Sequence, residues 1–539
     1  MHKVAQLVNT LRYLKPIQVF ARLGNKLPHG NVSNRRLEAS YEAQHKKAFP
    51  TYFRSWDGKD TFTFLNETHK ISEASDWNNS TWKKLWLYNL HYFDCLRQEG
   101  EGTEDAGAAI GLMRRWICEN HIGRGNGWEP YPISLRVVNW IKFLIKLRAS
   151  GHLPSSTELA EIETSLAIQV RWLRKRLEYH LLANHLLANA KALVFAGWYF
   201  GGKGYGVESD GEASGWLSKG MDIYRRELPE QVLDDGIHFE LSAMYHAIIL
   251  EDILDCYNIT GSNLFRDYAS RMLAGLELLT GPDGRLVMFN DAAEGIALPP
   301  KVLREYAKAL NIAPSLHDGS KVSGYVKLKA GDWTLLAKCG DIGPDYQPGH
   351  AHADSLSFEL WKGERKVVSD TGTDRYVVDE ERKRQRETAA HNAVIIDGKD
   401  SSEVWAGHRV ARRARSKIVA VSENELVAEC RDCNGNVIRR RLLLTPEGLS
   451  GTDDVLSFGE VGKRADHVVD VCFHFNPEIE GCSLSCSEPE AGVEETEEQC
   501  LLAKSFGRTV EGRCSVIRAI TACPIRLCWR LEVRGDGVG

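Results

Sequence analysis

The hydrophobic periodicity of this chain changes once, between Leu310 and Val322, and this change limits the possible folds more than any other feature. From about Thr81 to Leu310, apolar residues recur mainly at the spacing of amphipathic helices. After Val322 the chain alternates in short runs rich in β-branched and aromatic residues, such as GYVKLKAGDWTLLAK, SLSFELWKG and HNAVIIDG. The sequence therefore predicts a helical half followed by a β half.

The segments that separate the predicted helices and strands indicate the architecture of each half. Glycine-containing breaks divide the helical half into pieces of hairpin size, which predicts stacked antiparallel helix pairs. No helical segment separates successive strands in the β half, so we expect an antiparallel two-sheet sandwich rather than a parallel sheet. Without a long linker, the domains should pack closely and share a cleft. The expected domains are an N-terminal extension packing on the helical domain (residues 1–80), the helical domain (81–315) and the sandwich (316–539).

The charge and the cysteine content exclude several broad classes of protein. A formal net charge of −5 over 539 residues argues against a generally basic nucleic-acid-binding surface, so an acidic ligand requires a local positive site. The 13 cysteines are odd in number and scattered, which is not the pattern of a disulfide framework. We therefore expect no nucleic-acid partner, and the oligomeric state is left open.

No segment predicts a membrane span or an export signal. The most apolar long stretch, from Leu181 to Phe200, carries Asn184, His185 and Lys191, which would be costly in lipid. The N-terminal segment is basic but lacks the unbroken apolar run and the small-residue cleavage site of a secretory signal. We expect a cytoplasmic location for the chain as written, with periplasmic or secreted locations left open.

Two segments of the helical half carry unusual polar residues. Asn184 and His185 interrupt the apolar stretch LLANHLLANAKAL, where the alternative to a functional role is a core pair satisfied by backbone carbonyls. The segment DGIHFELSAMYHAIIL places further ionisable side chains before and within a helix. A capped helix start with a buried tyrosine would explain only part of this crowding. Its members are Asp235, His238, Glu240, Tyr245 and His246.

A third segment lies in the β half. In GHAHADSLSFELW, His350, His352 and Asp354 alternate, so they share one face if the chain is extended. Downstream, Asp370 follows a strand-like run and His391 precedes another. Imidazole and carboxylate groups on adjacent strands suit zinc or manganese, and the alternative is a hydrogen-bonded structural cluster.

Taken together, the motifs ANHLLANAKAL, DGIHFELSAMYH and GHAHADSLSFELW…DTGT…HNAV resemble those of the heparinase II/III superfamily of polysaccharide lyases. The resemblance runs by motif from about Tyr88 to Gly398 and continues by β character to the end. It implies an (α/α) toroid of helix hairpins followed by an antiparallel β-sandwich. It also implies cleavage of uronic-acid-containing polysaccharides by β-elimination, which leaves 4,5-unsaturated uronate ends.

The resemblance implies a role for each catalytic candidate. Asn184, with His185, would neutralise the substrate carboxylate and so stabilise the charge that develops when the C5 proton leaves. Tyr245 would act as base, acid or both, and His350 would stand on the opposite side of the sugar ring. A tyrosine base needs a lowered pKa, which nearby cationic groups would provide.

The resemblance also implies a divalent metal ion with a structural role, namely Zn, Mn or Ca. Its ligands would be His352, Asp370 and His391.

Further residues are candidates for substrate binding around the cleft. Arg136 could pair with a carboxylate or sulfate and Trp128 could stack on a sugar face, although both could equally pack between helices. The full set of substrate-binding candidates is His91, Tyr92, Trp128, Arg136, Glu240 and His246.

The motifs are compatible with more than one class of substrate. Some relatives with a dual substrate range carry a glutamate one helical turn after the histidine of the Asn-His motif, where this chain has Ala188, so the substrate range of those relatives is not transferable to this chain. Glycosaminoglycans such as hyaluronan, chondroitin sulfate and heparan sulfate come first, and alginate or a bacterial exopolysaccharide second. Two other classes stay open, namely a hydrolase using Asp235 and Glu240, and a non-catalytic protein that binds or assembles surface polysaccharide.

Overall fold

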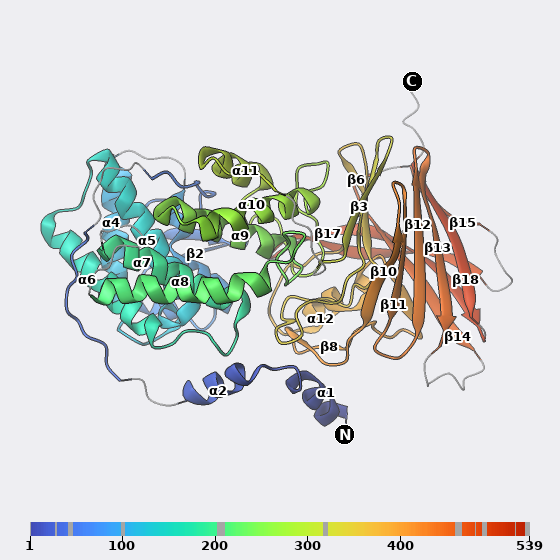
Figure 1. The fold of residues 1–539 in the computed structure, drawn as a ribbon, viewed down its shortest axis with the longest axis horizontal. Coiled ribbons are helices and arrows are strands. Elements are labelled where there is room, and N and C mark those ends of the chain that lie inside the picture. The colour runs from blue at the N-terminus through green and yellow to red at the C-terminus, as the bar shows by residue number, and fades with distance from the viewer. Residues whose placement is uncertain are drawn as a thin grey trace.

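The computed structural model describes residues 2–26, 30–40, 47–98, 103–201, 211–315, 322–458, 466–479, 481–487, 493–522 and 524–533. The helical half and the β half form two bodies that lie side by side along the long axis of the molecule (Figure 1). Among the described residues, none of the helices combines the length and the hydrophobicity that a membrane-spanning segment requires.

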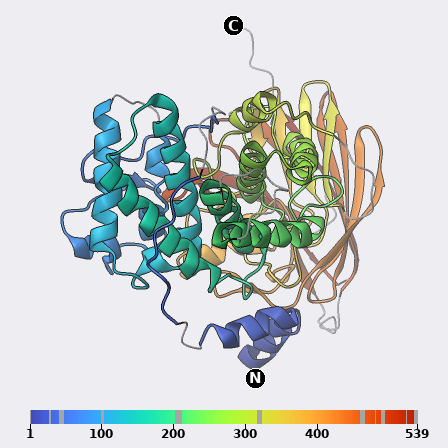
Figure 2. The ribbon, with the colours of Figure 1, turned by 60° about the vertical axis from the view of Figure 1, so that its left-hand side comes forward.

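The helical domain packs antiparallel helices around one continuous core. The long helix α5 (Pro130–Ser150) shows why they form: a proline starts it, Gly151 at φ 75° ends it, and Val137, Ile141 and Leu144 are buried at helical spacing. Figure 2 shows this domain from a second side. The other helices are α1 (His2–Leu11), α2 (Pro16–Gly24), α3 (Lys84–Tyr92), α4 (Thr103–Glu119), α6 (Ser156–Arg174), α7 (Ala183–Gly201), α8 (Glu212–Gln231), α9 (Ala243–Thr260), α10 (Asn263–Leu278), α11 (Pro300–Ala309) and, in the β half, α12 (Glu380–Arg386).

The β half is an antiparallel sandwich. Within the described residues, one sheet has the order β10-β11-β12-β13-β18-β15 and the other β16-β17-β14-β6-β5-β4-β3, with β7 also paired to β14. Trp529 packs between the sheets against Phe358 and Phe473. The strands of the two sheets are β3 (Tyr325–Ala330), β4 (Trp333–Lys338), β5 (Phe358–Lys362), β6 (Arg365–Val368), β7 (Val394–Ile396), β10 (Arg415–Val421), β11 (Glu425–Arg431), β12 (Val437–Thr445), β13 (Gly448–Ser457), β14 (His467–Phe475), β15 (Cys482–Ser487), β16 (Val493–Ser505), β17 (Arg508–Thr521) and β18 (Ile525–Val533).

The two bodies share buried apolar surface. Tyr346 and Phe506 from the β half belong to the helical core, and a separate cluster joins Leu241 and Phe289 to Trp361. This packing agrees with the expected close contact between the domains and places loops of both at one cleft.

The N-terminal extension contacts both bodies, whereas the sequence predicted that it packs on the helical domain. Its hairpin, β1 (Thr61–Phe64) with β2 (Glu67–Lys70), packs on α3 of the helical domain. Lys15 forms an ion pair with Glu230 of α8. Thr10 of α1 instead accepts a hydrogen bond from Trp405 in the short β8 (Val404–Trp405), which pairs with β9 (Arg409–Val410). The extension therefore bridges the two domains.

Candidate active site

A cavity of about 570 Å³ lies where loops of the β half meet the helical domain. Aromatic side chains form much of its wall, including Tyr88, Tyr92 and Tyr131 from the helical domain and Tyr376 and Phe506 from the β half. Asn184, His185, Tyr245 and His350 line the same cavity. The structure thus brings together the four catalytic candidates that the sequence scattered over more than 160 positions.

Asn184 stands at the start of α7 and is held by Glu240. The Asn184 side-chain amide donates to both carboxylate oxygens of Glu240, at 2.9 and 3.0 Å, and the Asn184 backbone N–H donates to one of them at 3.1 Å. The same amide nitrogen lies 3.4 Å from Nε2 of His350. Glu240 is almost fully buried, so its carboxylate orients the amide from behind.

Tyr245 and His350 form a stacked pair. Their ring centroids are 3.8 Å apart with an interplanar angle of 26°. The Tyr245 hydroxyl lies 3.2 Å from the hydroxyl of Tyr376. The expectation that Tyr245 and His350 flank the sugar ring from opposite sides is therefore wrong, because stacked rings leave no room for a sugar between them.

The expected low pKa of Tyr245 is also not found. Burial raises the pKa of Tyr245 well above its ordinary value, and the neighbouring Tyr376 raises it further. The Tyr245 phenol therefore holds its proton at neutral pH, which suits a proton donor better than a base.

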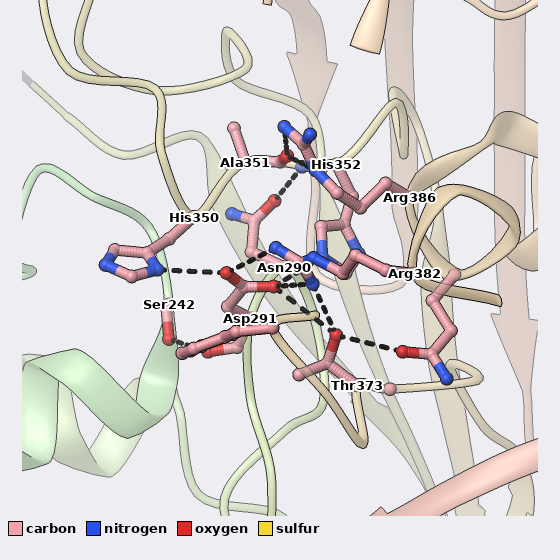
Figure 3. Close-up of polar contacts among 12 residues, drawn as sticks. Ser242, Asn290, Asp291, His350, Ala351, His352, Thr373, Arg382 and Arg386 are labelled. Atoms are coloured by element: carbon pink, nitrogen blue, oxygen red, sulfur yellow. Dashed lines mark hydrogen bonds and ion pairs between the residues drawn. The ribbon is translucent and has the colours of Figure 1, made fainter. Parts of the chain in front are cut away.

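Asp291 connects this pair to the β half (Figure 3). Its Oδ2 lies 2.9 Å from Nδ1 of His350, and its Oδ1 lies 2.8 Å from Nε2 of His352. Arg382 donates to both oxygens, at 2.5 and 2.8 Å. The Arg382 guanidinium and the hydrogen bonds from His350 and His352 outweigh the effect of burial and hold the pKa of Asp291 well below its usual range. Asp291 is therefore a carboxylate that fixes the ring of His350.

His185 points toward the cavity beside Glu178. Its Nδ1 lies 3.0 Å from Glu178 Oε1, and its ring lies 4.6 Å from the ring of Tyr131. Burial disfavours the protonated imidazole, but the Glu178 carboxylate outweighs burial and raises the pKa of His185. This residue can thus supply positive charge near a bound carboxylate.

Carboxylates neutralise much of the cationic charge at the cavity wall. Arg97 donates to Glu251 at 2.6 Å. Lys191 donates to Asp252 at 2.6 Å and to Asp255 at 2.5 Å. Apart from histidines, Arg54 is the remaining cation among the described residues that line this cavity.

The expected metal ligands fit a metal ion in part. His352 Nδ1 and His391 Nε2 are buried and have no hydrogen-bond partner among the described residues. The other ring nitrogen of each histidine faces a carboxylate: His352 Nε2 faces Asp291, and His391 Nδ1 lies 2.7 Å from Asp370 Oδ2. This is the arrangement of metal-binding histidines whose far nitrogen is held by a carboxylate. In the described part, however, no set of three His, Cys, Asp or Glu side chains converges as a metal site, and Asp370 lies behind His391.

Three of the substrate-binding candidates pack inside the helical domain. His91 is fully buried between the carbonyl of Trp77 and the indole N–H of Trp116, and burial lowers its pKa to about 3. Arg136 is fully buried and donates to the carbonyls of His91 and Gly127 and to the side chain of Gln169. Trp128 is 5% exposed and packs against Trp116 and Trp172. These side chains hold helices together and cannot contact a sugar.

The remaining three substrate-binding candidates have different positions relative to the cavity. Tyr92 lines the cavity. His246 is fully buried, with one ring nitrogen 2.9 Å from the carbonyl of Met272 and the other accepting from the backbone N–H of His238. Glu240 positions Asn184 rather than lining the cavity. His246 is therefore structural, and Glu240 acts through its neighbour.

Four further residues line the cavity or hold its side chains and were not predicted from the sequence, namely Asp291, Tyr376, Glu178 and His408. Asp291 follows Asn290 after the apolar run LVMF, and a buried acid after such a run was the available signal. Tyr376 lies just beyond the DTGT motif. Nothing local distinguishes Glu178 or His408, because only the fold brings them to the cavity.

Several residues next to the catalytic candidates adopt left-handed backbone conformations. Leu182 and Ala183 adopt φ of 62° and 49° immediately before Asn184, and Leu241 adopts 55° at the turn before Tyr245. Asn290 adopts 59° beside Asp291. Left-handed conformations are costly for residues other than glycine and persist where the surroundings enforce them. Tight turns thus aim these side chains at the cavity.

The chain is similar to two curated proteins. One is a heparin-sulfate lyase from Bacteroides stercoris, 25% identical over 278 residues that cover 46% of this chain and 40% of that protein. The other is a heparin-sulfate lyase from Pedobacter heparinus, 24% identical over 325 residues that cover 53% of this chain and 47% of that protein. The chain therefore matches less than half the length of these relatives.

Solved structures share the fold. A heparinase III structure aligns with a TM-score of 0.62 at 14% identity, covering 97% of this chain and 90% of that one. A heparan sulfate lyase from Pedobacter heparinus aligns with a TM-score of 0.54 at 16% identity, covering 96% of this chain and 87% of that one. The predicted fold class, an (α/α) toroid followed by an antiparallel sandwich, is confirmed.

Two consecutive family models match almost all of the chain beyond its first hundred residues. The model described as the heparinase II/III N-terminus matches residues 111–317. The model described as heparinase II/III-like, C-terminal, matches residues 314–537. The motif resemblance, the fold and these matches agree, and the chain belongs to the heparinase II/III family.

Proposed function

We propose that this protein is a polysaccharide lyase that cleaves uronic-acid-containing polysaccharides by β-elimination. The observation that carries the proposal is the convergence of an amide, an oriented imidazole and a protonated phenol on one cavity. These are the groups that elimination next to a carboxylate needs, namely a carboxylate partner, a base and an acid.

His350 acts as the base in this proposal. Asp291 is a carboxylate and accepts from Nδ1–H of His350, which leaves the lone pair on Nε2. The Asn184 amide nitrogen lies 3.4 Å from Nε2 and can donate to that lone pair until the substrate carboxylate takes its place. Nε2 takes the C5 proton of the uronate, and the electrons of the C5–H bond move toward the carboxylate.

Tyr245 acts as the acid. As the C4–C5 double bond forms and the bond from C4 to the leaving oxygen breaks, the phenol of Tyr245 donates its proton to that oxygen. Its raised pKa supports this role, because the phenol is protonated before the reaction. The proton that His350 has taken restores the phenol before the next turnover.

Asn184 and His185 neutralise the carboxylate that makes elimination difficult. Each lines the cavity, and the raised pKa of His185 favours its positively charged form. Glu240 orients the amide of Asn184 from the buried side. Charge developing on the substrate carboxylate is then met by fixed donors.

The stacking of Tyr245 on His350 supports a stereochemical preference. A base and an acid on the same side of the cavity suit a uronate whose C5 proton and C4 oxygen lie on the same side of the ring. Glucuronate has this arrangement and iduronate does not. We therefore place glucuronate-containing glycosaminoglycans first, with alginate or a bacterial exopolysaccharide as the second candidate.

The charge of the cavity supports a polymer with few sulfates. Arg97 and Lys191 are committed to buried carboxylates, which leaves Arg54 and the histidines for anions among the described lining residues. Hyaluronan and weakly sulfated stretches of chondroitin sulfate or heparan sulfate fit this charge better than densely sulfated chains.

A divalent ion is part of the proposal as a structural component. His352 and His391 would hold it through their unpartnered nitrogens, and Asp370 would orient His391. Two imidazoles favour Zn or Mn over Ca. Such an ion would tie the loop that carries His350 to the sandwich.

The positions of Asp235 and Glu240 argue against the hydrolase alternative. Asp235 accepts from the backbone N–H and hydroxyl of Ser323, at 2.7 and 2.6 Å, and Glu240 is bound to Asn184. Neither of these carboxylates lines the cavity. They are not placed as an acid and a base across a glycosidic bond.

The test is short-wave ultraviolet absorbance during incubation with hyaluronan, chondroitin sulfate, dermatan sulfate, heparan sulfate and alginate. The proposal expects absorbance from the new double bond with a glucuronate polymer and little with iduronate-rich dermatan sulfate. Reducing ends without absorbance would support hydrolysis instead. Binding of a polymer without any cleavage would support the non-catalytic alternative.

A further inference from the structure

Helices α1 and α2 reverse the usual orientation of a surface helix, in which apolar side chains are buried and polar side chains are exposed. Their polar side chains face the protein: Gln6 donates to Glu403 at 3.2 Å, and Thr10 accepts from Trp405 at 3.1 Å. Gln18 is fully buried and donates to the carbonyls of Tyr346 and Leu181, at 3.3 and 3.4 Å. Polar contacts thus hold α1 and α2 on the body of the protein.

The apolar side chains of these helices face outward. On α1 they follow the spacing of a single helical face, and on α2 they lie away from Gln18. Phe20 is 71% exposed, Val4 66%, and Val8 and Leu23 each 58%. So many exposed apolar side chains on two neighbouring helices are unusual on a protein surface and indicate an interaction site, which is called the apolar patch below. Its members are Val4, Leu7, Val8, Leu11, Ile17, Val19, Phe20 and Leu23.

The charged side chains that α1 and α2 themselves carry are all positive. The first acidic residue of the chain is Glu38, although the whole chain has a net charge of −5. Lys15 is paired with Glu230. The exposed cations Lys3, Arg12, Arg22 and Lys26 have no carboxylate partner within the described residues. The patch is therefore apolar, contains an aromatic residue and is bordered by unpaired positive charge.

We propose that α1 and α2 form a docking surface for an anionic lipid bilayer, with the apolar patch inserted at the interface and the cations near the headgroups. Amphipathic helices with an apolar face and basic borders bind membranes in this way. The helices are too short to span a bilayer, so the mode of binding is peripheral.

The charge argues against a second copy of this chain as the occupant. A twofold dimer would place the same patch against itself and would bring the cations of both copies together. An anionic surface instead neutralises them. In Figure 1 the two helices lie along one long side of the molecule, beside both domains, where a flat surface can reach them.

This surface is connected to the cavity wall. Leu181 lines the cavity, as does Gln347, which follows Tyr346 in the chain. Gln18 therefore links the outward helices to segments of both domains that border the cavity. Taken with the proposed function, on which this last step rests, docking would hold the cavity close to a membrane surface.

Vesicle flotation of the full chain tests the proposal, with one set of vesicles of phosphatidylcholine alone and another containing about one part in four phosphatidylglycerol. We expect binding to the anionic vesicles only, and weaker binding as salt is raised. The double variant Val8→Glu with Phe20→Glu should bind at least ~10-fold more weakly, as should Arg12→Gln with Arg22→Gln.

A matched control is Val421→Glu with Ile520→Glu, since these residues are 50% and 58% exposed on the sandwich. This control should bind like the original protein. Equal binding by the control and the Val8/Phe20 variant, or no binding to anionic vesicles, would overturn the proposal. A dimer in light scattering that the Val8/Phe20 variant abolishes would assign the patch to a second copy instead. Thermal unfolding checks that each variant folds.

Discussion

Asp291 Oδ2 lies 2.9 Å from Nδ1 of His350, and this contact joins a loop of the helical half to a loop of the β half. The same carboxylate is bound by Arg382, so the orientation of His350 depends on an ion pair buried between the domains. The base of the proposed reaction is thus positioned by residues that do not contact the cavity.

Replacement of Asp291 tests this positioning role. Asp291→Asn should lower kcat by about 100-fold with a small change in KM, because the amide cannot favour the same ring orientation of His350. It should also lower the melting temperature, since Arg382 loses its buried partner. Steady-state kinetics and thermal unfolding measure both effects. Asp267→Asn, at an exposed position, is the control, and an equal loss in both variants would remove the special role of Asp291.

Replacement of Tyr245 and replacement of Tyr376 should lower kcat by very different factors. Tyr245→Phe removes the proposed proton donor and should lower kcat by about 1,000-fold or more. Tyr376→Phe removes a hydroxyl that contacts only Tyr245 in the described hydrogen bonds, and we expect about a 10-fold loss. Product absorbance gives both rates. Near-normal activity of Tyr245→Phe would rule out its role as the acid.

His185 should make stability depend on pH in a defined direction. Its pKa is raised above the ordinary value of 6.5, so its contribution is fully present below that value and is lost as pH rises through the raised pKa. His185→Gln should therefore lower the melting temperature more at about pH 6 than at about pH 9. Thermal scans of both proteins at each pH provide the comparison, and an equal difference at both would contradict the assigned shift.

Metal analysis tests the structural ion. The purified protein should contain about one equivalent of Zn or Mn, and chelation should lower its melting temperature. His391→Ala should lose the metal, whereas His408→Ala, in the cavity wall, should keep it. Metal content is measured by elemental analysis, independently of activity. Protein without metal but with unchanged stability would mean that His352 and His391 form a hydrogen-bonded cluster.

Replacement of Arg136 tests whether this residue stabilises the helical domain or binds substrate. Arg136→Gln should destabilise the protein by about 3 kcal/mol, because a fully buried guanidinium holds two carbonyls and a side-chain amide. Its KM should change little. Arg54→Gln, at the exposed cavity wall, should instead raise KM without changing the melting temperature. Denaturant unfolding and kinetics distinguish the two variants, and a raised KM for Arg136→Gln would restore its role in substrate binding.

The division into a helical and a β half could be predicted from the amino-acid sequence, because side-chain periodicity records which face of each element is buried. The family could be predicted as well, because the motifs containing Asn184, Tyr245 and His350 are local strings. Which polar residues face the cavity depends instead on how the helices and loops pack. Arg136 and Trp128 have the chemistry of sugar-binding residues, but they lie on helix faces that point inward.

The partners of the proposed catalytic residues were likewise decided by the fold. Asp291 and Glu178 reach His350 and His185 through loops and helix ends whose packing no local pattern encodes. The pKa of Tyr245 could not be predicted from its motif, because it depends on burial and on Tyr376, 131 residues away. Sequence records which groups are available, whereas distance and burial, which set their chemistry, exist only in the folded chain.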